Sequence, residues 1–520
     1  MELFPITLPQ NNICTETELY YRCAKAVYDE TAGTLTIPKK SVLTLDTYFN
    51  CFSYSKYQQY THASVLEIHA RVQGEVQLCL MKAELKGKKI QRTALLTRHV
   101  HNEQLDEVTM LYDFSRETGN GFLYLEVTAL SKTAVFAGGY YASPVPPEQI
   151  NRTKLAAVIC TYKREEYVKR NLQHLNSSIF TQDSKIADHI EILVIDNGQT
   201  LSTEQIQTSH ITLYPNKNYG GSGGFTRGII EALKRKSEFS HVLLMDDDIL
   251  LESSVLVKTI RFLQIVREEH QDLAIGGSML RLDTMNIQHE AGGRWTGYNV
   301  DTSRANIALT NIKNLLQNEQ FDQTDFCGWW YVAIPLMIVD ANNLPMPYFI
   351  KNDDIEYGMR VTKKLDFFNG IGVWHEPFEK KLSLPLEYYY TRNILITNAI
   401  HEESVWNSIY TLIRRVGKCM VRRNYSASKI PLKAVDDLFR GFDYFKAIES
   451  DLFHKELTAI CKEYDLSKKE KRGFLKTGLV LVGYCILLFV KYPVVKKEYH
   501  TRYQEACCYE NWCRLLGINK

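Results

Sequence analysis

The alternation of apolar and polar residues divides the 520-residue chain into three stretches of different character. Before about residue 145, apolar residues recur at every second position, as in 66–72 and, after Gly74, in 76–80. This period indicates strands with one buried face, and the break at Gly74 predicts a hairpin. Because several such runs follow one another, we expect an antiparallel, jelly-roll-like β-sandwich over residues 1–147.

A proline-rich segment, residues 143–147, precedes a stretch in which short apolar runs alternate with helical segments. The runs 155–160, 192–195 and 241–245 are almost entirely apolar and end in polar residues. Such strands, alternating with helices, are typical of a parallel sheet built from βαβ units. We therefore expect an α/β domain over residues 148–385.

Helical patterns with interspersed basic residues dominate the remaining stretch, residues 386–520. The apolar run 479–490 has lysines on both sides and is shorter than the roughly 20 residues that a spanning helix needs. Two interpretations stay open for it. The run is a helix buried in the protein, or a helix that lies on an anionic membrane surface.

The strongest chemical signal is the acidic run Asp246, Asp247 and Asp248, which directly follows the third apolar run. In open α/β sheets, ligands bind outside the carboxyl ends of the strands, and three carboxylates there repel one another unless a cation neutralises them. Alternate residues of an extended chain point the same way, so Asp246 and Asp248 can face one Mg²⁺ or Mn²⁺ ion. Asp247 would then point toward donor or protein. The alternative is an acidic turn that caps the next helix.

Other strand ends deliver polar residues to the same edge of the predicted sheet. Thr161 and Arg164 follow the first apolar run, Asp196 follows the second, and His375 ends a further candidate strand. The acidic pair at 353–354 also follows apolar residues. A lone histidine is more often structural, and an acidic pair also suits a helix N-terminus.

Two more segments are compatible with a ligand site, and each also has a purely structural interpretation. Glycines at 220–224 would let the backbone approach a phosphate at a helix start, although the segment matches neither the P-loop nor the dinucleotide fingerprint. The alternative interpretation of residues 220–224 is a flexible loop that contacts no ligand. Trp329 and Trp330 suit the apolar face of a sugar, or a protein core.

Composition excludes several classes of function. The net charge is only +2, from 62 basic and 60 acidic residues, and no basic run carries the aromatics of a nucleic-acid module. The 12 cysteines are scattered without a CxxC pair, which argues against zinc ribbons and for a reducing cytoplasm. The N-terminal residues do not resemble a signal peptide.

These motifs, in this order, resemble those of nucleotide-sugar-dependent glycosyltransferases of family 2, and in particular the galactofuranosyltransferases that polymerise galactan. The resemblance implies an N-terminal β-sandwich, a central Rossmann-like GT-A domain and a C-terminal helical region. It rests on residues 159–164, 218–227, 246–248, 329–330, 351–354 and 374–375.

The resemblance also implies a role for each matching residue. A uridine diphosphate donor would be bound by Thr161, Tyr162, Arg164, Asp196, Asn218, Asp246 and Asp247. Mn²⁺ or Mg²⁺ would be coordinated by Asp246, Asp248 and His375. Asp354 would be the general base, and the acceptor would be bound by Trp329, Trp330 and Asp353. Two positions depart from the family pattern, Asn352 in place of an aromatic residue and Lys163 in place of an uncharged one.

The implied enzyme is a metal-dependent inverting transferase that moves galactofuranose from UDP-galactofuranose to a growing cell-surface glycan. Its acceptor would be lipid-linked, and the enzyme would lie in the cytoplasm, at the inner face of the cell membrane. The sequence leaves open a homo-oligomer. It also leaves open a transferase for another nucleotide sugar, such as rhamnose or galactose, or a non-catalytic glycan-binding scaffold.

Overall fold

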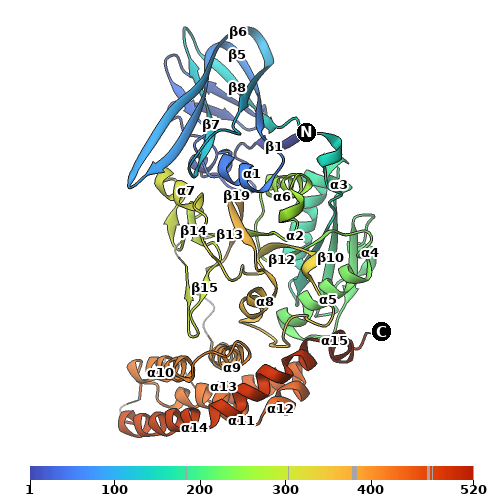
Figure 1. Cartoon of the computed structure of the whole chain (residues 1–520), viewed down its shortest axis with the longest axis vertical. Coiled ribbons are helices and arrows are strands. Elements are labelled where there is room, and N and C mark those ends of the chain that lie inside the picture. Colours follow the sequence, from blue (N-terminus) through green and yellow to red (C-terminus); the bar gives the residue numbers. More distant parts are fainter. Residues whose placement is uncertain (182–183, 303, 378–382, 465–468, 471, 519–520) are drawn as a thin grey trace.

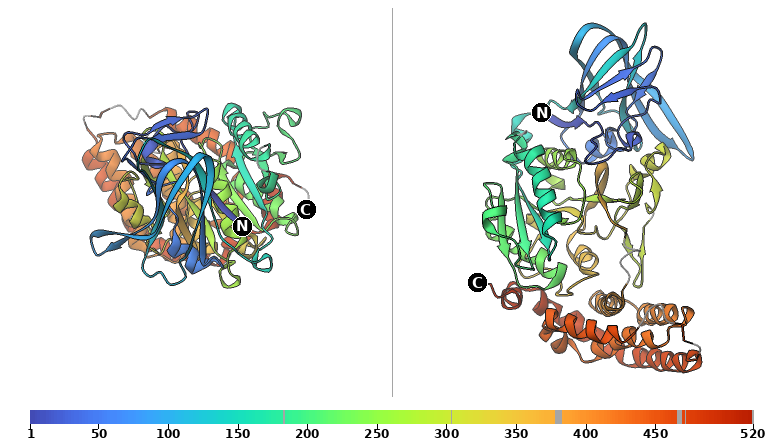
Figure 2. Two further views of the ribbon diagram at one scale, coloured as in Figure 1. Left: turned by 90° about the horizontal axis from the view of Figure 1, so that it is seen from above. Right: turned by 180° about the vertical axis from the view of Figure 1, so that it is seen from behind.

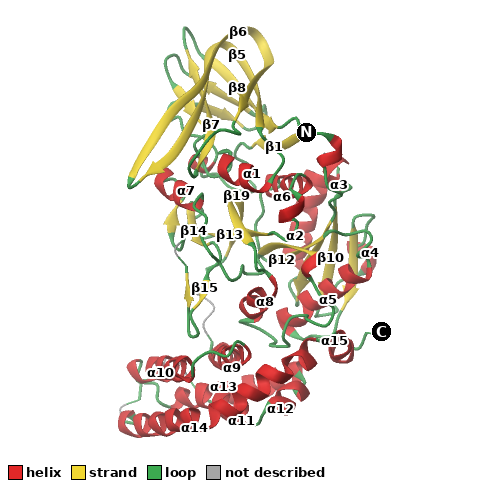
Figure 3. Ribbon diagram, viewed as in Figure 1, coloured by secondary structure: helices red, strands yellow, loops and turns green. Residues whose placement is uncertain are grey.

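In the computed structural model, the chain forms three regions that are stacked along its longest axis (Figure 1). All residues are described except 182–183, 303, 378–382, 465–468, 471 and 519–520. Strands form the N-terminal end, strands and helices mix in the centre, and helices form the C-terminal end (Figure 3). The order of the regions in space therefore follows their order in the sequence.

The N-terminal region is an antiparallel sheet of eight strands. The two longest, β5 and β6, pair along nearly their whole lengths, and β5 also pairs with β7 and β8. A short helix, α1 (Tyr54–Tyr60), lies between β4 and β5. The strands are β1 (Glu2–Ile6), β2 (Val27–Asp29), β3 (Thr34–Ile37), β4 (Val42–Thr44), β5 (Val65–Lys86), β6 (Lys89–Asp113), β7 (Gly121–Ala129) and β8 (Ala134–Ala142).

The hairpin predicted at Gly74 is wrong, because β5 runs through this residue without turning. Gly74 has φ +100°, and the register of β5 against β6 shifts between Val72 and Gly74, an irregularity of the β-bulge type in which β6 contains the extra residues. Alternation resumes beyond a bulge as it does beyond a turn, so the two look alike in sequence. Antiparallel pairing is confirmed, whereas hydrogen bonding joins the eight strands in one sheet rather than two.

The central region is built on a nine-stranded sheet in the order β11-β10-β9-β12-β18-β13-β14-β17, with β19 beside β13. The three apolar runs form β9, β10 and β12, which are parallel as predicted. However, β18 is antiparallel to β12 and β13, so the sheet is mixed. The strands are β9 (Leu155–Thr161), β10 (Ile190–Asp196), β11 (Ile211–Pro215), β12 (His241–Asp246), β13 (Ala274–Arg281), β14 (Ile287–Glu290), β17 (Ile307–Ala308), β18 (Tyr331–Pro335) and β19 (Leu365–His375).

The glycine-rich segment is helical rather than a flexible loop, since Gly220 to Gly224 form the first turns of α5 (Gly220–Lys234). A Cβ atom on Gly228 would lie 2.2 Å from the Val158 side chain, so glycine allows α5 to lie directly on β9. Other helices of this region are α2 (Glu165–Leu175), α3 (Ser184–Ala187), α4 (Thr203–Ile206), α6 (Ser254–Gln264), α7 (Ile312–Asn318) and α8 (Asp353–Val361). Helix α8 begins at the acidic pair, one of the two interpretations that the sequence offered for this pair.

The C-terminal region is a layer of helices beneath the central sheet (Figure 2, right). Its final helix returns to the central region, where Trp512 Nε1 donates a hydrogen bond to the Pro345 carbonyl oxygen at 2.9 Å. The helices are α9 (Leu384–Ile400), α10 (Val405–Val421), α11 (Lys429–Phe439), α12 (Phe442–Ala447), α13 (Ser450–Lys462), α14 (Phe474–Cys507) and α15 (Tyr509–Leu516).

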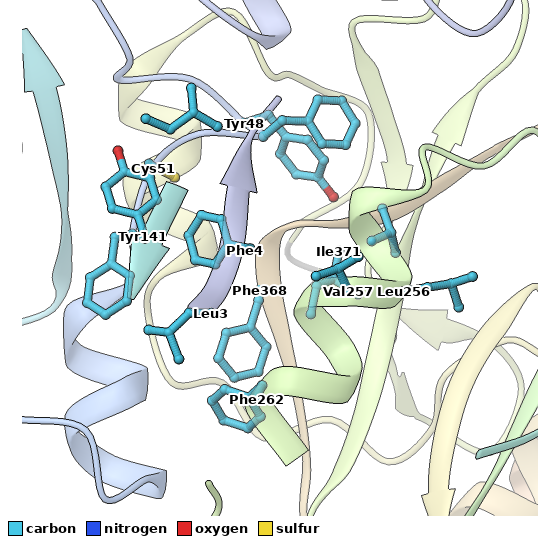
Figure 4. Packing of buried hydrophobic residues seen from close by; sticks show 14 of the residues in the cluster. Leu3, Phe4, Tyr48, Cys51, Tyr141, Leu256, Val257, Phe262, Phe368 and Ile371 are labelled. Carbon is cyan, nitrogen blue, oxygen red and sulfur yellow. The ribbon is translucent and has the colours of Figure 1, made fainter. Parts of the chain in front are cut away.

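One hydrophobic core joins the N-terminal and central regions. Phe4 of β1, Phe262 of α6 and Phe368 of β19 pack in the same cluster (Figure 4). Beside it, Lys56 of α1 is fully buried, and its Nζ lies 2.8 Å from an Asp366 carboxylate oxygen. The two regions are therefore joined by a continuous buried interface.

Candidate active site

A cleft of about 790 Å³ opens where the strand ends of the central sheet face α8, α9 and α10. Its acidic lining residues are Asp246, Asp247, Asp248, Glu290, Asp353 and Asp354. Its basic and imidazole lining residues are Arg164, Lys351, His375, Arg414, Arg415 and Lys418. The acidic run, the acidic pair and the histidine, which are far apart in sequence, therefore share one cleft.

Asp246, Asp248 and His375 form a cluster suited to a metal ion, as predicted. One ligand atom from each lies within 4.8 Å of the others, and His375 Nε2 is 3.1 Å from Asp248 Oδ1 and 3.7 Å from Asp246 Oδ2. Backbone hydrogen bonds between Leu250 and Trp374 hold the end of β19 against the segment after the acidic run. Two carboxylates and an imidazole fit Mn²⁺ or Mg²⁺.

Asp247 points away from this cluster, toward the protein. Its Oδ2 accepts a hydrogen bond from the Thr161 hydroxyl at 2.7 Å, and Arg164 Nη1 lies 3.3 Å from its Oδ1. Burial raises the pKa of Asp247, while Thr161 and Arg164 oppose the rise. Since Arg164 also contacts Asp248 Oδ2 at 2.6 Å, it ties the acidic run together at the edge of the cleft.

Other residues predicted to bind donor interact here with protein. The buried Asp196 carboxylate accepts hydrogen bonds from the backbone N–H groups that follow β10. Asn218 donates to Asp451 of α13 at 2.9 Å, and Tyr162 is exposed, with Lys163 Nζ over its ring. These three and Thr161 are not among the residues that line the cleft, and donor binding by them stays a prediction.

The acidic pair forms the first residues of α8. Its alternative interpretation, a helix N-terminus, therefore also agrees with the structure. Asp353 is buried, and its Oδ2 accepts a hydrogen bond from the Ser222 hydroxyl of α5 at 2.8 Å. Burial and the neighbouring Asp353 carboxyl raise the pKa of Asp354 well above the usual aspartate range. A raised pKa suits a carboxylate that accepts a proton during a reaction.

The turn before α8 has an unusual backbone, because Phe349, Lys351 and Asn352 all have φ between 70° and 75°. Positive φ costs energy in residues with a side chain, and such turns persist only where their surroundings hold them. A Cβ atom on Gly220 would lie 2.1 Å from the Phe349 carbonyl oxygen, so glycine is needed where α5 meets this turn.

Buried residues of α9 hold the same turn. Asn393 Nδ2 donates hydrogen bonds to the carbonyl oxygens of Ile350 at 2.9 Å and Lys351 at 2.8 Å. Asn352 in turn donates to the Thr397 hydroxyl at 3.0 Å. The helical region thus contributes, together with α5, to holding the acidic pair in place.

Trp329 and Trp330 line the cleft and are also largely buried, so both of their predicted roles are compatible with the structure. Trp329 packs edge-to-face on Phe225 of α5, with ring centroids 5.2 Å apart. Trp330 Nε1 donates a hydrogen bond to the Gly277 carbonyl oxygen at 2.8 Å. These contacts fix both rings, and a fixed ring can present a constant surface to a sugar.

The sequence did not identify every lining residue. Glu290 ends the short strand β14 and has no local signal, because its neighbours carry neither a motif nor an acidic run. The sequence did contain a signal for three other lining residues of the cleft. These are Arg414, Arg415 and Lys418 of α10, which are basic residues at helical spacing. Their place in the cleft depends on how α10 packs, which the spacing does not give.

Comparison with known proteins supports the family resemblance. Residues 152–374 match the family model described as glycosyltransferase like family 2, whose members have the Rossmann-like GT-A fold, and residues 7–143 match that of the galactofuranosyltransferase 2 N-terminal domain. Galactofuranosyltransferase GlfT2 of Mycobacterium tuberculosis is 25% identical over 457 residues, which cover 82% of this chain and 70% of that protein. GlfT2 of Mycolicibacterium smegmatis is 25% identical over 455 residues, covering 82% and 68%.

Proposed function

We propose that this chain is a family 2 glycosyltransferase that transfers galactofuranose from UDP-galactofuranose to a hydroxyl of a growing cell-surface glycan, with inversion. One observation carries the proposal. The Asp246, Asp248 and His375 cluster and the acidic pair at the start of α8 lie in the same cleft. The galactofuranosyltransferase N-terminal match and the resemblance to the two GlfT2 proteins support this donor sugar.

In the proposed reaction, the sugar leaves a nucleoside diphosphate and joins an acceptor hydroxyl. Mn²⁺ or Mg²⁺, held by Asp246, Asp248 and His375, would neutralise charge on the diphosphate. Arg164, beside the acidic run, adds a fixed positive charge at that end of the cleft. Asp354 accepts the proton of the attacking hydroxyl, as inversion by single displacement requires one base.

Donor and metal can be tested together with a panel of nucleotide sugars. Purified protein is incubated with a galactofuranosyl disaccharide acceptor, Mn²⁺ and UDP-galactofuranose, UDP-galactopyranose or a nucleotide-activated rhamnose. We expect transfer from UDP-galactofuranose alone and its loss in EDTA, with recovery on adding Mn²⁺. Transfer from another donor would overturn the sugar assignment, and full activity in EDTA would overturn the metal assignment.

We also propose that the enzyme works on the inner face of the cell membrane, where a lipid-linked acceptor would be available. Helix α14 is long and apolar enough to cross a membrane by length and composition alone, yet most of its apolar window is exposed. One face of α14, including Leu488 and Tyr492, packs into the helical layer. Its outer face exposes Leu479, Ile486, Phe489 and Val490, with Trp406 of α10 beside Phe489.

Because one face of α14 is fixed to the other helices, we expect it to lie on a membrane rather than cross it. Wild-type protein should sediment with phosphatidylglycerol vesicles and be released by an alkaline carbonate wash. Phe489→Glu and Val490→Glu should abolish sedimentation and leave the fold intact. Resistance to the wash would instead support a spanning helix.

The N-terminal sheet fits a sandwich that braces the central region, and we propose that role for it. Strand β5 changes neighbours near the register shift at Gly74, pairing with β8 over residues 67–73 and with β7 over residues 76–84. Such a change of partners allows one hydrogen-bonded sheet to fold into two layers.

A further inference from the structure

Helix α10 gives one wall of the cleft a positive charge that the transfer chemistry described above does not use. Arg414, Arg415 and Lys418 line the cleft, and Arg422 follows one turn later. Arg415 Nη1 lies 3.2 Å from a carboxylate oxygen of Glu387. Within the part of the chain that the structure describes, no carboxylate lies within ion-pair distance of Arg414 or Lys418.

This arrangement is unfavourable for the protein alone. Cations at adjacent positions and one turn apart on a helix repel one another. Burial lowers the pKa of Lys418, and Arg415, Arg422 and Arg414 lower it further against the opposing effect of Glu387. An anion bound at this wall would relieve the repulsion and gain charge-assisted hydrogen bonds.

The positively charged wall formed by α10 connects to the turn before the acidic pair, rather than to the cluster of Asp246, Asp248 and His375. Arg415 lies over the Tyr390 ring, 4.7 Å from its centroid, and Lys351 Nζ lies 5.4 Å from the same centroid. Lys351 belongs to the turn that directly precedes α8, the helix that carries Asp354. The metal cluster comes instead from β12 and β19 of the central sheet, with Arg164 as its own positive charge.

We propose that Arg414, Arg415 and Lys418 form a subsite for a phosphate or diphosphate group carried by the acceptor. The group would not react, and its binding would orient the acceptor so that its hydroxyl meets Asp354. The proposal rests on the transferase function above for the identity of the ligand, but not for the existence of the anion site.

Two measurements test the subsite in wild-type protein, in Arg414→Gln/Lys418→Gln and in the control Arg422→Gln. Arg422 directly follows the last residue of α10 and lies outside the cleft. The first is calorimetric binding of methyl phosphate with Mg²⁺ and UDP saturating, so that the donor site is filled. We expect binding to wild type and Arg422→Gln, and at least about tenfold weaker binding to the double variant, as for a lost charge-assisted hydrogen bond.

The second measurement compares kcat/KM for a galactofuranosyl disaccharide with a methyl phosphate aglycone and the same disaccharide with a methyl aglycone. The phosphorylated acceptor should be preferred by about tenfold in wild type, and the preference should disappear in the double variant only. Equal methyl phosphate binding in all three proteins, or an unchanged preference in the double variant, would overturn the subsite.

Two further outcomes separate the subsite from its context. If wild type uses neither acceptor but methyl phosphate binding still depends on α10, the proposed function fails and the anion site stands. If the double variant loses binding to phosphatidylglycerol vesicles yet keeps its acceptor preference, these cations hold lipid headgroups, and the acceptor assignment is wrong.

Discussion

Asp354 combines three properties that a general base needs, namely a place in the cleft, a raised pKa and a fixed backbone. Replacing it with asparagine keeps its shape but removes the group that accepts a proton. We expect Asp354→Asn to lower transfer by about 10²–10⁴-fold. Its affinity for UDP with Mn²⁺, measured by calorimetry, should stay close to wild type, because Asp246, Asp248 and His375 are untouched. Near-normal turnover would contradict the assignment.

The environment of Asp354 also predicts how the rate depends on pH. The base is active when ionised, and burial and Asp353 raise its pKa, so kcat/KM should rise with pH to a plateau. Its half-maximum should lie well above about pH 4, the ordinary aspartate value.

The control for this pH profile is Asp353→Asn, which removes the neighbouring like charge. The half-maximum should move to lower pH even if the plateau falls. A half-maximum that is identical in wild type and Asp353→Asn would show that another group titrates.

At the residue scale, the apolar runs predicted that Asp246, Asp248 and His375 meet at one edge of a sheet, and the family resemblance predicted that they bind a metal ion. Donor binding by Thr161 and Asp196 stays a prediction. Both are also strand-end residues, but their side chains hold the acidic run and the backbone after β10. Position at an edge is visible in sequence, whereas the direction in which a buried polar side chain points depends on its partners.

At the scale of elements, the acidic pair depends on two helices from different parts of the chain. Gly220 of α5 leaves room for the Phe349 carbonyl oxygen to pack closely against it. Asn393 of α9 donates hydrogen bonds to the next two carbonyl oxygens, those of Ile350 and Lys351. The sequence predicted α8 and the helical nature of α9. It could not predict their contact, because a buried asparagine in a helix gives no sign of which turn it binds.

Asn393→Ala tests whether α9 positions the base. Without the hydrogen bonds from Asn393 to the carbonyl oxygens of Ile350 and Lys351, the strained turn should relax and displace Asp354. A displacement of about 1 Å can cost about 100-fold in rate. We expect kcat to fall by that order, with UDP affinity and the KM for donor little changed.

Asn398→Ala is the matched control for Asn393→Ala. This asparagine is also buried in α9, but it donates to the Gly297 carbonyl oxygen, away from the turn. If both variants lose the same stability in urea and the same kcat, Asn393 has only a structural role.

At the scale of the whole molecule, β19 connects the regions. Near its start, Asp366 and Phe367 accept hydrogen bonds from the buried Lys56 of the N-terminal region, and its last residue, His375, belongs to the cluster suited to a metal ion. The sequence indicated the end of this strand but not its beginning, since Lys56 looks like any surface lysine. Pairing between residues 310 positions apart becomes visible only in the folded chain.

Lys56→Ala should therefore affect both stability and the distant metal site. The Asp366 carboxylate would stay buried without its partner, which typically costs about 3–5 kcal/mol, measurable by urea denaturation. Because β19 also carries His375, Mn²⁺ affinity should fall as well, although Lys56 contacts no metal ligand.

The informative comparison is Lys56→Met/Asp366→Leu, in which apolar groups of similar size replace both charges and should restore much of the stability. If that pair recovers stability but not Mn²⁺ affinity, the hydrogen bond from Lys56 to the Phe367 carbonyl sets the position of β19. If Lys56→Ala binds Mn²⁺ like wild type, the N-terminal region braces the fold without supporting the active site.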